Sequence, residues 1–258
     1  MEISLTGRAA IVTGGSKGIG FGVATRFAES GADVAIVARG REALDLAQKS
    51  IAATARGRVV AIQADVAIAT DVTRVYDEAM KALGKIDIIV NNAGTSRAGP
   101  FENLTDEVMQ QDLDQKFYAA LRLTRRVWPQ MKERRWGRVI NVLNVGAKSP
   151  RAGSAPTTIS RAAGMALTKV LAGEGAPFNI LVNALLVGFI EADQHVQAAK
   201  RAGVSLEDYM GRFIKEIPIG RAGRPEEFAN MACFLVSDAG SYITGTAINI
   251  DGGRSPVV

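Results

Sequence analysis

Short apolar runs alternate along the chain with longer segments in which apolar residues recur at helical spacing. Apolar residues predominate within each run and do not alternate regularly with polar ones, which is typical of parallel strands buried on both faces. The runs are Ala9–Thr13, Val34–Ala38, Val59–Gln63, Ile86–Val90, Val139–Leu143, Ile180–Leu186 and Ala247–Ile250. This alternation predicts an α/β fold with a doubly wound parallel sheet. Because no Pro/Gly/Ser-rich linker divides the chain, residues 1–258 are predicted to form a single domain.

The helical patterns begin near Gly18, Glu42, Thr70, Thr105, Thr158 and Glu226. Thr105 is a candidate N-cap, and Pro225 suits a first helical position. The segment 190–217 breaks the alternation, since it is polar, helical in pattern and placed after a strand end, where such sheets bind ligands. We expect it to be a substrate lid; the alternative is a static surface insertion. His195, the only histidine, lies within it and either reaches the site on closure or stays at the surface.

Composition excludes several classes of protein. The chain is 47% hydrophobic and 22% charged, as is ordinary for a globular protein. A single cysteine, Cys233, excludes an intramolecular disulfide and fits a reducing compartment. The first strand pattern starts within a few residues of Met1, so no signal peptide is expected, and no apolar run approaches the roughly 20 residues of a membrane span. We therefore expect a cytoplasmic protein with no membrane partner.

The basic excess is small, with 31 Lys and Arg against 26 Asp and Glu, a net charge of +5. The densest basic stretch comprises Arg122, Arg125, Arg126, Lys132, Arg134, Arg135 and Arg138, at a predicted helix end and turn. Cations there are favoured by the helix dipole. We interpret the stretch as a solvated face and expect no nucleic-acid partner, because nucleic acid requires the excess to be gathered on one surface. Weak attraction of acidic substrates remains compatible with the charge.

A glycine-rich loop, Thr13-Gly14-Gly15-Ser16-Lys17-Gly18-Ile19-Gly20, follows the first apolar run and opens a helical pattern. Glycines at this spacing let the backbone turn tightly and approach a pyrophosphate, while the helix N-terminus faces the negative charge. Asn91-Asn92-Ala93-Gly94 closes the fourth run in the same way. We therefore predict a dinucleotide site that includes Gly14, Ser16, Lys17, Gly18, Ile19, Gly20, Asn92, Ala93 and Gly94.

The end of the second strand decides between the two nicotinamide cofactors. An acidic residue there would bind a ribose 2′-hydroxyl and repel a 2′-phosphate. This chain has Ala38 and Arg39 instead, with Lys17 in the loop, and cations suit a phosphate. NADP(H) is favoured over NAD(H); the alternative for both cations is simple solvent exposure. Asp65-Val66 follows the third strand and either binds the adenine amino group or serves as a helix cap or turn.

These residues resemble the signature motifs of the short-chain dehydrogenase/reductase family over essentially the whole chain. The resemblance rests on the glycine loop, Asp65, the Asn-Asn-Ala-Gly motif and the C-terminal motifs Pro218-x-x-Arg221-x-x-Arg224-Pro225-x-Glu227, Tyr242-Ile243-Thr244-Gly245 and Asp251-Gly252-Gly253. It implies a Rossmann-like single domain, a nicotinamide cofactor, a small-molecule substrate and a homo-oligomer, either tetramer or dimer. No metal is expected.

All four catalytic positions of that family are substituted here. The family uses Asn, Ser, Tyr and Lys: tyrosine transfers the proton, lysine lowers its pKa and holds the nicotinamide ribose, serine orients the carbonyl, and asparagine supports a water relay. Aligned on Ile140-Asn141-Val142 and Ala162-Ala163, these positions hold Lys116, Asn144, Thr157 and Arg161, in the order Asn, Ser, Tyr and Lys. A further motif, Pro-Gly-x-x-x-Thr in the family, is also changed, because this chain has Val187-Gly188-Phe189-Ile190-Glu191-Ala192. The backbone of Ile190 is expected to face the nicotinamide amide.

Physical chemistry decides what these substitutions retain. Thr157 is a far weaker acid than tyrosine, and Arg161 cannot shuttle a proton, although its fork can hold ribose hydroxyls. Asn144 can still donate to a carbonyl oxygen. Lys116 is the candidate proton donor if burial and the charge of Arg161 lower its pKa towards neutrality. The alternative is a plain i, i+4 ion pair between Lys116 and Asp112.

Two functions follow from this pattern. One is an NADP(H)-dependent oxidoreductase with an atypical proton-transfer site, acting on a carbonyl or alcohol or on an enoyl group, possibly of an acyl thioester. The other is a catalytically silent NADP(H)-binding protein, either a redox sensor or an inactive partner subunit. We favour the enzyme, because the four substitutions keep polar groups with hydrogen-bonding capacity.

Overall fold

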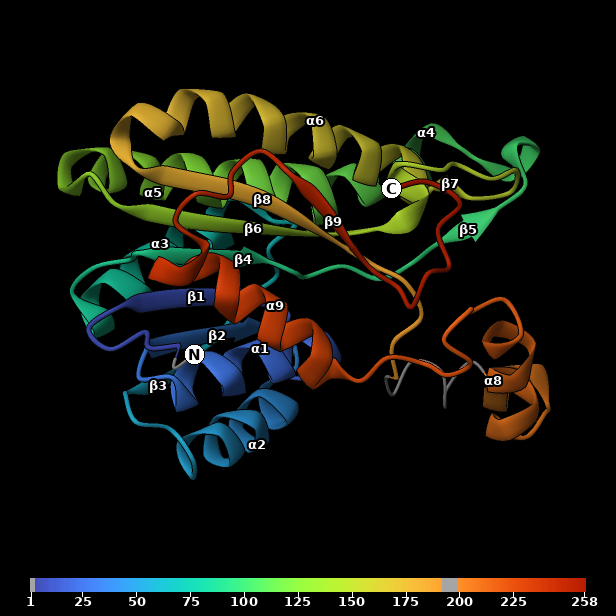
Figure 1. The fold of residues 1–258 in the computed structure, drawn as a ribbon, viewed down its shortest axis with the longest axis horizontal. Coiled ribbons are helices and arrows are strands. Elements are labelled where there is room, and N and C mark those ends of the chain that lie inside the picture. Colours follow the sequence, from blue (N-terminus) through green and yellow to red (C-terminus); the bar gives the residue numbers. More distant parts are fainter. Residues whose placement is uncertain (1–2, 192–198) are drawn as a thin grey trace.

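The computed structural model describes residues 3–191 and 199–258. Its core is a seven-stranded parallel sheet with the order β3-β2-β1-β4-β6-β8-β9 (Figure 1). The strands are β1 (Ala9–Thr13), β2 (Asp33–Ala38), β3 (Val59–Gln63), β4 (Ile88–Asn91), β6 (Gly137–Asn144), β8 (Ile180–Val187) and β9 (Ala247–Ile250). The strand order reverses between β1 and β4, and the carboxyl ends of strands at such a reversal are the usual ligand site of an open α/β sheet.

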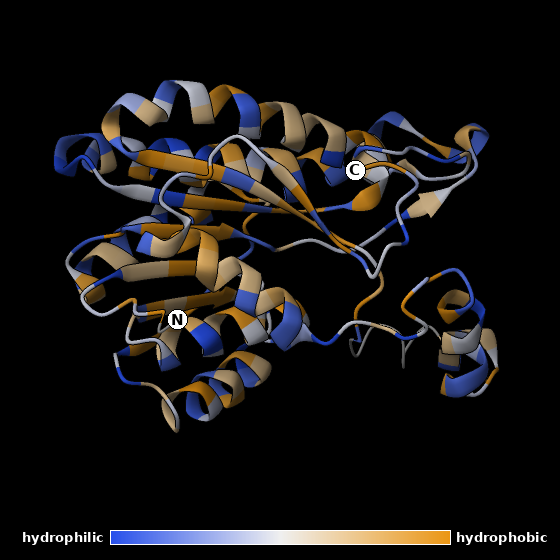
Figure 2. Cartoon of the chain, viewed as in Figure 1, coloured by the Kyte–Doolittle hydropathy of each residue, from blue (hydrophilic) through white to orange (hydrophobic). Residues whose placement is uncertain are grey.

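Helices cover both faces of the sheet and enclose two apolar cores (Figure 2). One face carries α1 (Gly18–Glu29), α2 (Arg41–Ala52) and α9 (Pro225–Val236). The other carries α3 (Ala69–Leu83), α5 (Ala119–Arg134) and α6 (Thr157–Gly175). α4 (Asp106–Leu113) leads through a π-helical turn (Asp114–Tyr118) into α5, and α8 (Leu206–Ile214) follows β8. The single-domain, doubly wound prediction is confirmed.

The pattern of apolar runs located the strands to within a few residues. Thr105 caps α4, because its side chain accepts from the Val108 amide, and Glu227 completes a capping box at the start of α9. A two-stranded antiparallel sheet, β5 (Ala98–Gly99) with β7 (Ala155–Pro156), is an element that the pattern does not predict, because two-residue strands have no periodicity. The predicted lid contains α8, but His195 lies outside the described residues; the lid function stays a prediction.

The basic stretch is only partly a solvated face. Arg138 is 2% exposed, which corrects the expectation for that residue; it donates to the carbonyl of Asn179 at 2.9 Å and lies over the Trp136 ring. Arg134 donates to the carbonyl of Ile86 at 2.8 Å. Arginine serves such roles because its fork bonds several carbonyls at once. No helix within residues 3–191 or 199–258 is long and apolar enough to cross a bilayer.

Candidate active site

The glycine loop joins β1 to α1 and packs against the turn after β4. Gly14 has a φ of +67°, and a Cβ at Gly20 would overlap the Gly14 carbonyl oxygen. From the β4 side, Asn92 Nδ2 donates to the Thr13 carbonyl at 2.9 Å, and the Ala93 amide donates to Thr13 Oγ1 at 3.0 Å. The fold therefore brings the two predicted cofactor motifs into direct contact.

The N-terminus of α1 is suited to an anion. Its N-cap, Lys17, is extended, and among the described residues of this turn no side chain caps the helix and no acid lies in the first turn. Gly18 begins the helix with a φ of +54°, and Ser16 and Ile19 are half-buried beside it. The first amides of a helix have no intrahelical acceptors and carry partial positive charge. This cradle fits a pyrophosphate.

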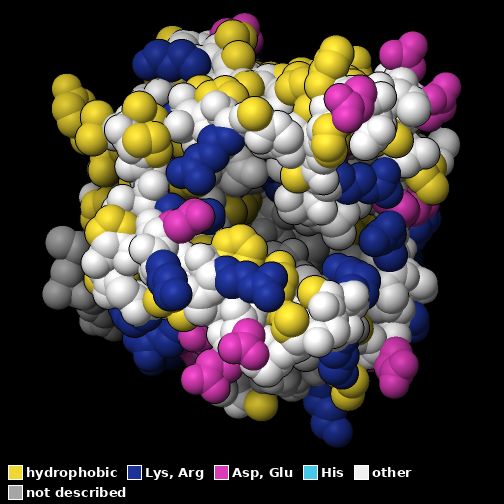
Figure 3. All heavy atoms as spheres, turned by 90° about the vertical axis from the view of Figure 1, so that its right-hand side faces the viewer, with side chains coloured by type: hydrophobic (Ala, Val, Ile, Leu, Met, Phe, Trp, Pro, Cys, Tyr) yellow, Lys and Arg dark blue, Asp and Glu magenta, His cyan; other side chains and the backbone are white. Residues whose placement is uncertain are grey.

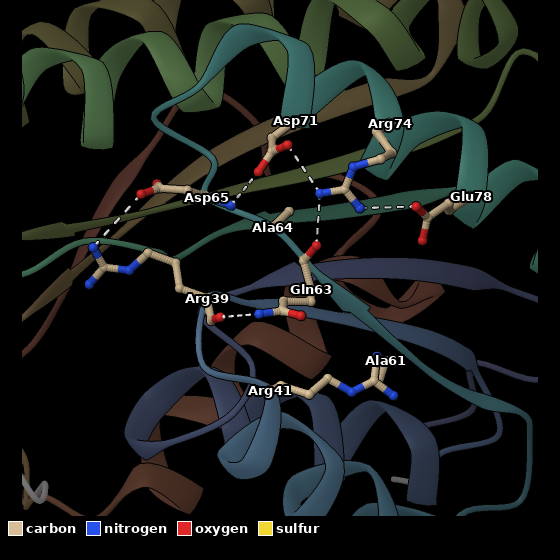
Figure 4. Close-up of a pocket in the computed structure, with 9 residues that line it drawn as sticks. All are labelled: Arg39, Arg41, Ala61, Gln63, Ala64, Asp65, Asp71, Arg74 and Glu78. Atoms are coloured by element: carbon tan, nitrogen blue, oxygen red, sulfur yellow. Dashed lines mark hydrogen bonds and ion pairs between the residues drawn. The ribbon is translucent and has the colours of Figure 1, made fainter.

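A pocket of about 600 Å³ lies beyond the carboxyl ends of β2 and β3 (Figure 4). Its lining residues are Arg39, Arg41, Ala61, Gln63, Ala64, Asp65, Asp71, Arg74 and Glu78. Arg39 Nη1 lies 3.8 Å from Asp65 Oδ2, and the Arg39 side chain is 63% exposed. Asp65 Oδ1 also accepts from the Ala67 amide at 3.0 Å, the turn role considered above, while Val66 is buried. An exposed guanidinium in so long a pair can turn to an incoming phosphate.

Thr157, at the family's tyrosine position, lies at the start of α6 and meets two other segments of the chain. Its Oγ1 accepts a hydrogen bond from Lys116 Nζ at 2.9 Å and another from the backbone amide of Arg97 at 2.9 Å. The pairing of Gly99 with Ala155 in the β5–β7 sheet joins the segment after Arg97 to the residues before Thr157. The side chains at the family's asparagine and tyrosine positions are therefore directly hydrogen-bonded.

Lys116 is buried within the site, in the π-helical turn. Its ammonium pairs with Asp112, so the ion pair considered as the alternative exists, but both side chains are only 1% exposed and lie beside Thr157. Burial lowers the pKa of Lys116 from 10.5 to about 8; the charges of Arg161 and Arg97 add to the lowering, and Asp112 opposes it. With a pKa of about 8, Lys116 is an ammonium at neutral pH.

The four catalytic positions of the family are called the tetrad positions below. Arg161 and Asn144 occupy two of them, those of the family's lysine and serine. Burial lowers the pKa of Arg161 to about 10, so it stays charged at neutral pH, and its Nη1 donates to the Val142 carbonyl. Among the described residues, its Nε and Asn144 Oδ1 are buried atoms with no hydrogen-bond partner. A Cβ at Gly94 would lie 3.1 Å from Lys116 Cγ and 3.2 Å from Arg161 Nη2, so this loop abuts the tetrad positions. Such atoms fit a ligand that supplies hydroxyl groups, as a ribose does.

The backbone at Ile190 continues this edge of the sheet. Ile190 forms a parallel bridge with Gly223, through bonds from Glu191 N to Gly223 O (2.9 Å) and from Gly223 N to Phe189 O (3.0 Å). The peptide groups of Ile190 itself therefore point to the opposite side of the strand. The proposed nicotinamide contact there stays a prediction.

The carboxyl edge of the sheet forms a face that is hollowed near its middle, with Lys and Arg side chains around the hollow (Figure 3). Three large apolar side chains at the ends of β6 and β8 pack against other parts of the protein. Leu143 lies against Gly164 of α6, Leu185 belongs to the core beneath α1 and α9, and Phe189 stacks on Phe213 with ring centroids 4.7 Å apart.

The residues at the four tetrad positions, together with Asp112, Ser160 and the backbone amide of Arg97, form what we call the tetrad cluster. Sequence reasoning missed two of its members and understated a third. Ser160 and the backbone of Arg97 contact the site from segments far from Lys116, and no spacing rule links them to it. Asp112 is predicted from the sequence only as the i, i+4 ion-pair partner of Lys116 on the same helix face. Its burial depends on α6 packing across α4, which is a tertiary effect.

Comparisons with known proteins agree with this geometry. A family model described as "Enoyl-(Acyl carrier protein) reductase" matches residues 14–255. The chain is 33% identical to the 3-oxoacyl-[acyl-carrier-protein] reductase FabG of Aquifex aeolicus, over 98% of this chain and 99% of that protein. It is 35% identical to the oxidoreductase UcpA of Salmonella typhimurium, over 97% and 95%.

Among solved structures, L-sorbose reductase from Gluconobacter frateurii, complexed with NADPH and L-sorbose, superposes with a TM-score of 0.96 at 33% identity, covering all of both chains. Family model, relatives and fold together show that the chain belongs to the short-chain dehydrogenase/reductase family of oxidoreductases.

Proposed function

We propose that this protein is an NADP(H)-dependent oxidoreductase that reduces a carbonyl group, with Thr157 and Lys116 in place of the family's usual proton-transfer pair. The observation that carries the proposal is the hydrogen bonding of Thr157, whose Oγ1 accepts from two N–H donors. A hydroxyl has two acceptor lone pairs and one hydrogen. With both lone pairs engaged, the O–H of Thr157 is left to donate along a third direction.

A substrate carbonyl oxygen suits that third direction. When bound, the reduced nicotinamide supplies a hydride to the carbonyl carbon. As negative charge develops on the oxygen, the Thr157 O–H proton moves to it, and Thr157 takes a proton from Lys116 Nζ over the 2.9 Å hydrogen bond. The products are an alcohol, an intact threonine and a neutral lysine that regains its proton from solvent. The acid is therefore Lys116, and Thr157 carries its proton.

The remaining proposed residues have binding roles. Asn144 directs the carbonyl through its side-chain amide, while Arg161 holds the ribose hydroxyls through its unpaired Nε. The uncapped α1 N-terminus takes the pyrophosphate, and Arg39 takes the 2′-phosphate. NADPH is the cofactor in the L-sorbose reductase complex, which supports the same choice here.

The relatives support a ketone as the reduced group. The FabG relative is named for a 3-oxoacyl substrate, and the structural neighbour holds a ketose sugar. The matching family model is described by an enoyl substrate. Reduction of an enoyl thioester also ends with a proton delivered to an oxygen or to the adjacent carbon, so this class is the second candidate.

The test is a fluorescence titration of NADPH and NADH into the pure protein, followed by a panel of 3-oxoacyl thioesters, ketoses and enoyl thioesters. We expect tight NADPH binding, weaker NADH binding and NADPH oxidation with a ketone. Tight binding without turnover on the full panel would favour the silent dinucleotide-binding protein. Failure to bind either nucleotide would exclude both functions.

A further inference from the structure

Asp112 is a buried carboxylate whose two oxygens have different partners. It is 2% exposed, on α4. One oxygen, Oδ1, pairs with the Lys116 ammonium, and the other, Oδ2, accepts from Ser160 Oγ at 2.6 Å. Ser160 is itself 1% exposed and lies one turn after Thr157 on α6. The two hydrogen bonds fix the carboxylate between the helices that carry Lys116 and Thr157.

From this geometry we infer that Asp112, oriented by Ser160, is a positioning residue that keeps Lys116 protonated and aimed at Thr157. The inference rests on the proposed function, because Lys116 is the acid in that reaction. Asp112 does not touch the reacting oxygen; it acts only through Lys116.

The charges around Lys116 explain why a carboxylate is needed. Arg161 faces it from α6 and Arg97 from the loop before β5, and both disfavour its ammonium, as does burial. Asp112, from α4, is the charge that opposes them. Removing the carboxylate charge would leave the amine beside two cations in a buried site, so it would lose its proton at a lower pH.

Geometry is the second contribution of Asp112. A lysine has a flexible four-carbon stem, and the Nζ of Lys116 is held by Asp112 and Thr157 together. Asp112 in turn cannot rotate without losing the bond from Ser160. Because proton transfer depends steeply on donor–acceptor placement, this order matters for the rate as well as for the charge.

The experiment compares Asp112→Asn with Asp114→Asn in the NADPH-loaded enzyme. Asp114 is the matched control, because it lies in the adjoining turn and pairs with Arg122 at 3.2 Å, away from Lys116. The pKa of Lys116 is followed by ¹³Cε NMR of labelled lysine, assigned by loss of the signal in Lys116→Arg. Rates of ketone reduction are measured over pH 5–10 on the same samples.

For Asp112→Asn we expect the Lys116 titration midpoint and the alkaline limb of the rate to move down together by at least about one pH unit. The rate at pH 9 then falls about tenfold, with NADPH affinity changed by less than about twofold. Asp114→Asn moves neither midpoint. An unchanged Lys116 midpoint in Asp112→Asn would overturn the inference.

Two further variants keep the inference testable if Asp112→Asn does not fold. Asp112→Glu retains the charge but shifts its position, so the midpoint should stay near that of the wild type while kcat falls. Ser160→Ala removes only the orienting bond and should likewise lower kcat with little change in midpoint. If kcat falls in neither variant, Asp112 does not position Lys116 and the inference is contradicted. The titration midpoint of Lys116 is measured by NMR and does not depend on turnover. Absence of activity in the wild type would therefore refute the proposed function, whereas the effect of Asp112 on Lys116 would still be decided by the NMR midpoints.

Discussion

The glycine loop and the tetrad cluster lie at the same edge of the sheet. The loop is shaped by backbone groups, whereas the tetrad cluster is formed mainly by side chains. The loop works through its backbone: Gly14 and Gly20 leave space and adopt a turn that side chains would block. The tetrad cluster works mainly through side-chain groups, and the residues at all four of its tetrad positions differ from those of the family. Its Lys116 and Thr157 still place an ammonium 2.9 Å from a hydroxyl.

The difference indicates which features of a dinucleotide-binding site can be supplied by other residues and which cannot. A backbone cradle has no substitute once a Cβ fills it. We propose that an ammonium–hydroxyl pair can be supplied from other positions, provided that its geometry and protonation state are kept. In the family's pattern the lysine belongs to the helix of the tyrosine. In the function proposed above, the lysine lies instead at the α4–α5 junction, and Arg161 occupies the family's lysine position.

Thr157→Val would break the tetrad cluster most severely. The change keeps the shape of the side chain and removes the hydroxyl, so we expect kcat for ketone reduction to fall about 10²–10⁴-fold. NADPH affinity, measured by fluorescence, should change by less than about twofold. Thr157→Ser restores the hydroxyl and should recover most of the rate; equal losses in both variants would contradict the role of Thr157.

Gly20→Ala would break the cofactor side instead. The added Cβ overlaps the Gly14 carbonyl, and we expect the NADPH Kd to rise at least about 100-fold, or about 2.7 kcal/mol. Gly40→Ala is the control, since a Cβ there meets no atom within 4 Å, and its Kd should stay within about twofold. Circular dichroism checks that both variants fold.

Arg39→Ala sharpens the comparison, because it tests the contact with the cofactor's 2′-phosphate separately from the contacts with the rest of the cofactor. A charge-assisted hydrogen bond contributes about 1.5–3 kcal/mol, so the preference for NADPH over NADH should fall about 10- to 100-fold. NADH affinity should not change. Arg125→Ala, on the exposed face of α5, tests for a general effect of charge; a similar loss there would exclude a specific phosphate contact.

The smallest effect concerns pH. Reduction requires the Lys116 ammonium, so the rate should be level below about pH 8 and fall about tenfold per unit above it, as the amine loses its proton. The reverse reaction requires the neutral amine and should rise over the same range. In Lys116→Arg the falling limb should disappear below pH 10, because a guanidinium stays protonated. If the alkaline limb of the rate persists near pH 8 in Lys116→Arg, a group other than Lys116 causes it.

The fold was predictable because its signals are local. Apolar runs located β1 and β3, and the glycine spacing marked the start of α1, since strand burial and backbone turns depend on neighbouring residues. Family alignment also supplied the four tetrad positions. It did not supply their connections: whether Lys116 faces solvent or Thr157 depends on the π-helical turn and on the packing of α6 across α4. Contacts such as Ser160 with Asp112 join residues 48 apart.

One donor to Thr157 comes from the main chain, and this has an evolutionary consequence. The amide of Arg97 is present whatever side chain occupies the position, so position 97 is free to drift without loss of that hydrogen bond. Only proline, which has no amide hydrogen, would delete it. One of the two hydrogen bonds that Thr157 Oγ1 accepts is thus protected against almost every substitution at position 97.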